Sequence, residues 1–88
     1  MLRAAAALPA VATTRSHAVV AVFATPVGPL HAAATDEGIV GLELRTTDEA
    51  FTASVGARTR RPVLPAADPA ASPAARVHLA TLEREVAE

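Results

Sequence analysis

The order of hydrophobic and polar positions predicts β-strands from residue 18 onward. Residues 18–24 form a run of alanine, valine and phenylalanine that is typical of a strand, and the turn sequence Thr25-Pro26-Val27-Gly28 ends it. Proline fixes φ at the second turn position, and glycine at the fourth position relieves the exit. Residues 30–35 then form a second predicted strand.

A third strand is predicted over residues 39–45, after the tripeptide Asp36-Glu37-Gly38. This tripeptide is typical of a hairpin loop, because glycine readily adopts the left-handed conformation that such a loop requires. Side chains along a strand point alternately to its two faces. Val40, Leu42 and Leu44 are therefore expected in the core, and Glu43 in water. The prediction is a three-stranded antiparallel meander.

A helix is predicted after the meander. Thr46 and Glu49 have the spacing of a capping box. Phe51 and Val55, one turn apart, are expected to lie over the sheet before Gly56 ends the helix. Residues 58–72, which carry three prolines among alanines, are predicted to be a poorly ordered connector.

A last helix is predicted to begin with Ser72 as N-cap and Pro73 as the first helical residue. Its apolar face at helical spacing consists of Ala75, Leu79, Leu82 and Val86. No stop signal precedes Glu88, so we expect the chain to be the front part of a longer polypeptide. The predicted fold class is α+β, with one domain over residues 17–88.

The composition lowers the expected stability of this domain. Of the 88 residues, 45 are hydrophobic, but 23 of these are alanine, and only 21 are leucine, isoleucine, valine or phenylalanine. A chain of this size buries only about 60% of its unfolded surface, so we expect it to be marginally stable or partly molten when isolated. The absence of cysteine excludes disulfides, a thiol catalyst and cysteine-ligated zinc. The net charge of −1 supplies no strong field for nucleic acid.

Residues 1–16 are interpreted as a disordered extension. They contain Arg3, an alanine-rich run and the tripeptide Ala10-Val11-Ala12, which is similar to a signal cleavage site. Pro9 interrupts this run, and no apolar stretch reaches the roughly 20 residues of a membrane span. A cytoplasmic location is therefore expected, with an exported small protein as a weaker alternative.

The titratable and nucleophilic residues predict no catalytic, cofactor-binding or metal site. The three histidines are too far apart for a typical metal site, and the two acidic pairs suit a hairpin loop and the first turn of a helix. The serines lack the flanking glycines of a catalytic nucleophile elbow. The glycines precede no helix, as those of a phosphate-binding loop do. The basic cluster has no aromatic neighbour that could stack on nucleic-acid bases. These residues are His17, His31, His78, Asp36, Glu37, Asp48, Glu49, Ser16, Ser54, Ser72, Gly38, Gly41, Arg58, Arg60 and Arg61.

Two segments together resemble a known family. They are the turn 25–30 (Thr-Pro-Val-Gly-Pro-Leu) and the hairpin 36–44 (Asp-Glu-Gly-Ile-Val-Gly-Leu-Glu-Leu). In this order they are similar to the N-terminal domain of the methylated-DNA–protein-cysteine methyltransferases, the O6-alkylguanine-DNA alkyltransferases of direct-reversal DNA repair. Residues 77–88 resemble the late helix of that domain, so the resemblance covers roughly residues 16–88 without the connector.

The resemblance implies a ribonuclease H-like domain that supports catalysis without performing it. In this family the acceptor cysteine and the DNA-recognition helix belong to a C-terminal domain, which takes the alkyl group from a flipped-out base. That domain is the implied partner, and DNA would be reached only through it. Some relatives hold structural zinc in the N-terminal domain, but the matching positions here are Thr35 and Val40, so no zinc is implied.

Two functions follow as hypotheses. The first is a supporting domain or fragment of an O6-alkylguanine-DNA alkyltransferase, itself inactive. The second is a non-catalytic interaction module that docks on another chain through a sheet edge or through the face around Phe51.

Overall fold

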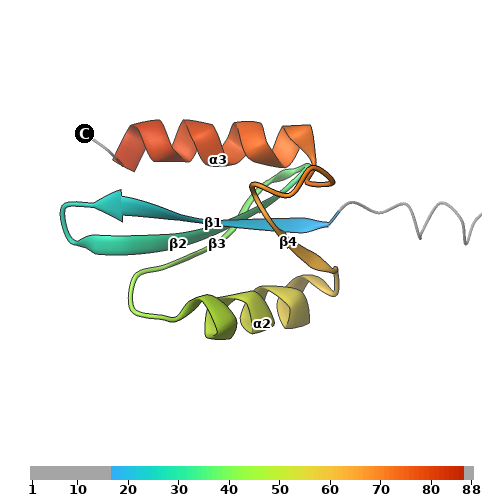
Figure 1. The fold of residues 1–88 in the computed structure, drawn as a ribbon, viewed down its shortest axis with the longest axis horizontal. Helices are drawn as coiled ribbons and strands as arrows, with labels where there is room; N and C mark the ends of the chain where they lie inside the picture. Colours follow the sequence, from blue (N-terminus) through green and yellow to red (C-terminus); the bar gives the residue numbers. More distant parts are fainter. Residues whose placement is uncertain (1–16, 87–88) are drawn as a thin grey trace, which may run out of the picture.

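The computed structural model describes residues 17–86, in which a sheet carries one helix on each face (Figure 1). The elements are β1 (Ala18–Thr25), β2 (Gly28–Thr35), β3 (Gly38–Glu43), α2 (Asp48–Thr59), β4 (Val63–Pro65) and α3 (Pro73–Val86). The strand order is β3-β2-β1-β4. The predicted α+β class is confirmed, whereas the expected extension at residues 1–16 lies outside the described residues.

The antiparallel meander of β1, β2 and β3 is confirmed. In the first turn Thr25 pairs with Gly28, and the Thr25 hydroxyl donates a hydrogen bond to the Gly28 carbonyl at 2.6 Å. In the second turn Gly38 has a backbone φ of 146°, which residues with a Cβ atom rarely adopt. Both turn motifs therefore form the hairpins that the sequence predicted.

The predicted three-stranded sheet is wrong in its strand count, because β4 pairs in parallel with β1. The Ala18 amide donates to the Pro62 carbonyl, and the Ala66 amide donates to the Val20 carbonyl, both at 2.9 Å. This strand lies inside the predicted connector. Its prolines argued against a strand, but β4 ends the strand order, and an edge strand needs few amide donors.

A β-bulge in β3 overturns part of the predicted core. Ala34 pairs with Ile39 and Ala33 pairs with Gly41, so Val40 is an extra residue without a partner. The bulge breaks the simple alternation. Val40 packs on the α2 side of the sheet as predicted, and Glu43 is exposed. The core positions predicted for Leu42 and Leu44 are wrong, since these side chains are 51% and 43% exposed.

Helix α2 begins and ends at other residues than predicted. Its N-cap is Thr47, whose hydroxyl accepts a hydrogen bond from the Ala50 amide at 3.1 Å, so Thr46 is not the cap. The helix continues through Gly56 and ends at Arg60, which has a φ of 57° and donates its amide to the Gly56 carbonyl. The predicted burial of Phe51 and Val55 is confirmed.

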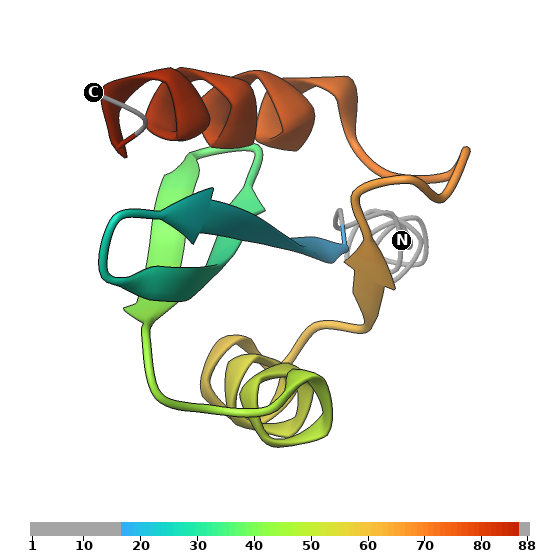
Figure 2. The same ribbon diagram turned by 60° about the vertical axis from the view of Figure 1, so that its left-hand side comes forward.

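Helix α3 follows the prediction. The Ser72 hydroxyl caps it by accepting from the Ala75 amide at 3.2 Å, and Pro73 is its first residue. Ala75 and Leu79 are buried, and Leu82 and Val86 pack beside them. The two helices lie on opposite sides of the sheet (Figure 2), so the sheet separates an α2 cluster from an α3 cluster.

Alanine makes up about half of the buried residues in the two clusters. The three alanines of β2, residues 32–34, are fully buried and alternate between the α3 cluster and the α2 cluster. Because β2 is a central strand with a helix on each face, its small side chains let both helices approach closely. The largest fully buried side chains are those of Phe51, Val19 and Val55.

Candidate binding pocket

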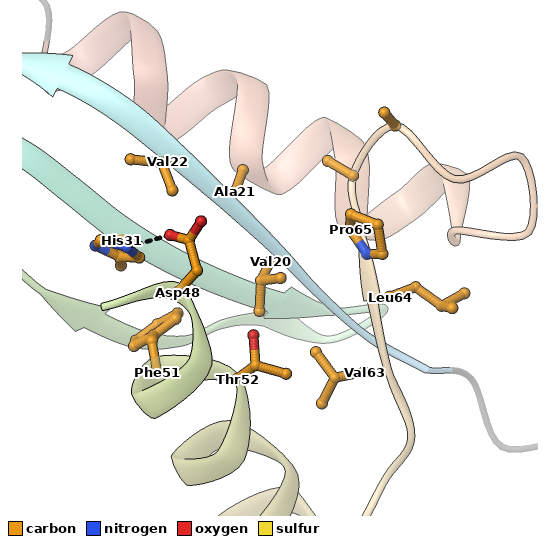
Figure 3. Close-up of a pocket in the computed structure, with 12 residues that line it drawn as sticks. Val20, Ala21, Val22, His31, Asp48, Phe51, Thr52, Val63, Leu64 and Pro65 are labelled. Carbon is orange, nitrogen blue, oxygen red and sulfur yellow. Dashed lines mark hydrogen bonds and ion pairs between the residues drawn. The ribbon is translucent and has the colours of Figure 1, made fainter. Parts of the chain in front are cut away.

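A pocket of about 520 Å³ opens on the α2 side of the sheet, between α2 and β4. Val20 and Val22 of β1 and Phe51 of α2 contribute apolar side chains to its walls, and the chain from Val63 to Ala67 closes the opposite side (Figure 3). This volume lies within the 300–1,000 Å³ range that is common for small-molecule sites.

Two ionisable side chains meet at one end of this pocket. His31 Nε2 lies 2.7 Å from Asp48 Oδ1, and both residues line the cavity (Figure 3). His31 comes from the middle of the sheet and is 8% exposed in its side chain, whereas the Asp48 side chain, in the first turn of α2, is 82% exposed. Because a carboxylate only accepts hydrogen bonds, the proton of this contact belongs to Nε2. This hydrogen bond between His31 and Asp48 thus connects β2 to the first turn of α2.

The other ring nitrogen of His31 is buried and has no hydrogen-bond partner among the described residues. The ring packs against Phe51, with 5.5 Å between ring centroids and a tilt of 56°. Buried polar atoms without a partner are rare in folded proteins, and each one calls for an explanation. With Asp48 on Nε2, Nδ1 lies in apolar surroundings without a partner among the described residues.

The structure separates the three histidines, as the sequence predicted. His17 precedes β1, and His78 lies on α3 with its Nε2 3.2 Å from the Asp36 carbonyl oxygen. His31, in contrast, is buried within β2. Within residues 17–86, no three histidine, aspartate or glutamate side chains are placed to hold a metal ion.

The remaining candidate residues have structural contacts. The Ser72 hydroxyl, besides capping α3, donates to Asp36 Oδ1 at 2.5 Å. Arg58 Nη1 donates to the Val40 carbonyl in the bulge at 3.1 Å. Arg61 Nη2 lies 4.0 Å from Glu37 Oε1. Arg60, the third residue of the basic cluster, ends α2. The acidic pair at 36–37 forms the second hairpin turn, and the pair at 48–49 begins α2, as predicted.

A second surface of interest is the free edge of β3, which ends the strand order. We call Ile39, Leu42 and Leu44 the edge surface; these side chains are 39%, 51% and 43% exposed. Ile39 and Leu42 pair with Ala34 and Ala32 of the α3 cluster, so they lie on the α3 side of the sheet. Three partly exposed large apolar side chains beside an open strand are typical of a docking surface.

No protein family, curated protein or solved structure matches this chain. Among the described residues, no helix has the length and apolar character needed to cross a membrane.

The sequence did not predict the pocket. His31 and Asp48 lie 17 positions apart, and no motif joins them. A histidine inside an apolar strand, next to three alanines, was the one local signal that could have pointed to this site.

Proposed function

We propose that this chain is the N-terminal supporting domain of an O6-alkylguanine-DNA alkyltransferase, with a ribonuclease H-like sheet. The observation that carries the proposal is the pair of turn motifs on which the family resemblance rests. They form the two successive hairpins of one antiparallel meander, as the resemblance implies. The amphipathic late helix then packs on one face of that meander.

The chemistry of the chain supports a non-catalytic role. The sequence contains no cysteine and therefore no thiolate that could accept an alkyl group. The hydroxyl of Ser72 accepts from the Ala75 amide at the start of α3 and donates to Asp36, so its contacts are those of a helix cap. The chain would therefore act by binding the domain that carries the acceptor cysteine.

The edge surface is the docking surface that this role requires. An open strand offers backbone hydrogen-bond groups to a partner, and partly exposed apolar side chains beside it become buried on association. Leu42 lies near the end of β3 and is the most exposed of the three edge side chains. It is therefore the best position for a test.

The test is association with a separately produced cysteine-bearing alkyltransferase domain, measured by isothermal titration calorimetry. We expect saturable one-to-one binding, with methyl transfer from methylated DNA to the cysteine-bearing domain alone. Leu42→Glu should abolish binding, because it places a charge in the docked surface. Val77→Glu is the matched control, since Val77 is 63% exposed and belongs to α3, not to the edge strand β3. Absence of binding by the unsubstituted chain would overturn the proposal.

The alternative is an interaction module that uses the same edge surface for a protein outside DNA repair. The partly exposed Ile39, Leu42 and Leu44 favour this function independently of the resemblance. It predicts no binding to the alkyltransferase domain. It also predicts recovery of a different partner by the unsubstituted chain and by the Val77→Glu variant, but not by Leu42→Glu.

A further inference from the structure

The pocket between α2 and β4 lies apart from the edge surface. The strand order places β3 at one end of the sheet and β4 at the other, so two strands separate them. A ligand in the pocket would contact β1, α2 and β4 and would leave the edge of β3 uncovered. The pocket and the edge surface can therefore be occupied independently of each other.

The walls of the pocket select an apolar ligand body. Val20, Val22 and Phe51 line it together with Val63 and Pro65. Val22 is 48% exposed, although the next residue of the strand, Phe23, is buried. Covering this side chain removes apolar surface from water, which is the main driving force for binding in such sites.

The charge at the pocket favours a cation. Among residues 17–86, Asp48 and His31 are the only ionisable side chains in its lining, and no arginine of this part of the chain lines it. The hydrogen bond from His31 Nε2 holds one carboxylate oxygen of Asp48, and so fixes the carboxylate at the end of the pocket. The full negative charge of Asp48 outweighs the roughly +0.5 charge at the N-terminus of α2.

The unpartnered Nδ1 of His31 supports a binding role for this pair. A histidine that served only to join β2 to α2 would gain stability from a second partner, yet Nδ1 is buried without one among the described residues. A functional role is one explanation for such an unsatisfied buried group. The only hydrogen bond of the ring is the one that orients the Asp48 carboxylate.

We propose that this pocket binds a small apolar amine in its ammonium form. The hydrocarbon part would lie against Val20, Val22 and Val63, and the ammonium group would donate to the Asp48 carboxylate. Because Asp48 is largely exposed, solvent screens this charge pair. Most of the affinity then comes from the apolar contacts, and the charge supplies the selectivity.

Three ligands of the same shape test the proposal: cyclohexylmethylamine, cyclohexylmethanol and cyclohexanecarboxylate. Each is titrated into the ¹⁵N-labelled full chain while amide shifts are followed by NMR. We expect saturating shifts for the amine at Val20, Val22, Thr52 and Leu64. The alcohol should bind about 2–5-fold more weakly, which is the range for an exposed charge pair. The carboxylate should bind more weakly still, because like charges repel.

Two matched variants locate the charge. Asp48→Asn keeps the side-chain shape, and should reduce the preference for amine over alcohol to about one. Glu49→Gln removes a charge one residue away and should leave most of the preference. The same spectra report whether each variant is folded. Equal binding of all three ligands, shifts confined to β3, or an unchanged preference in Asp48→Asn would each overturn the proposal, as would the absence of saturable shifts.

Discussion

The substitution Phe51→Ala tests the packing of α2 on the sheet most directly. Phe51 is 1% exposed and lies in a cluster with Ala18, Ala33 and Val55. Its ring also contacts His31 and passes under Gly41, where an added Cβ would lie 3.6 Å from Phe51 Cζ. Removal of the ring would leave a cavity that these small neighbours cannot fill.

The expected loss follows from the burial of this ring. Replacement of a fully buried phenylalanine by alanine lowers the free energy of unfolding by about 3–5 kcal/mol. A domain of this size has a total stability of about 4–10 kcal/mol, at about 0.05–0.15 kcal/mol per residue. The variant should therefore lose between a third of its stability and all of it. Leu42→Ala is the comparison, because Leu42 is 51% exposed. Full burial of a leucine side chain stabilises a protein by roughly 1.5–3 kcal/mol. Because Leu42 is only half buried, Leu42→Ala should lower the free energy of unfolding by about 1 kcal/mol.

The measurement is urea unfolding followed by far-ultraviolet circular dichroism. Chain concentration is varied to check that the midpoint does not depend on association through β3. If Phe51→Ala shows no cooperative transition, the substitution has removed at least the whole free energy of unfolding of the unsubstituted chain. The slope against urea should be about 1 kcal/mol per molar, which makes a loss of 1 kcal/mol resolvable as a midpoint shift.

A loss in Leu42→Ala equal to that in Phe51→Ala would refute this reasoning. It would mean that Leu42 lies in the core and that the alternation of β3 is unbroken, without the bulge at Val40. A loss below about 1 kcal/mol in Phe51→Ala would show that α2 does not pack on the sheet as described.

The remaining predictions concern single sites and the isolated chain. Thr47→Ala should lower the free energy of unfolding by about 1 kcal/mol, because its hydroxyl caps α2, whereas Thr46→Ala should change it by less than about 0.5 kcal/mol in the same urea assay. Gly56→Ala should raise stability by about 0.5–1 kcal/mol, since the position is helical and the added Cβ meets Val63 Cγ2 at an ordinary 3.5 Å. Gly38→Ala should instead lower stability by about 1–3 kcal/mol, because φ is 146° there; an equal effect of the two glycine substitutions would contradict the assigned backbone. The isolated chain should take no label from O6-methylguanine DNA, and stoichiometric labelling would disprove this. Thermal unfolding should be broad or occur at low temperature, and a sharp transition above about 65 °C would contradict the expected marginal stability.

The local sequence determined the elements that short-range chemistry specifies. The two hairpins follow from turn residues within four positions of one another, at 25–28 and 36–38. Helix α3 follows from Ser72 and Pro73 at its start and from an apolar face at helical spacing. Phe51 and Val55 were predicted to be buried for the same reason, since residues one turn apart share a face.

The bulge in β3 was decided by pairing with β2. Alternation predicted one face for Val40 and Leu42, but a single extra residue in the ladder moves them to opposite faces. The bulge is stabilised by contacts on the α2 side of the sheet. There the Val40 side chain packs against the α2 cluster, and the Val40 carbonyl accepts a hydrogen bond from Arg58. No periodic pattern in β3 itself could indicate this, because the contacts that stabilise the bulge come from another element.

Tertiary structure also decided β4 and the pocket. The strand Val63–Pro65 has only three residues, of which the last is a proline, and Pro62 precedes it. It forms because β1 has an unpaired edge at the place that the chain reaches after α2 has crossed the sheet. That crossing packs Val63 against the α2 cluster and forms the pocket between α2 and β4, with His31 and Asp48 at its end. Turns and helix caps are set by neighbours in sequence, whereas a parallel strand pair and a pocket join residues that only the folded chain brings together.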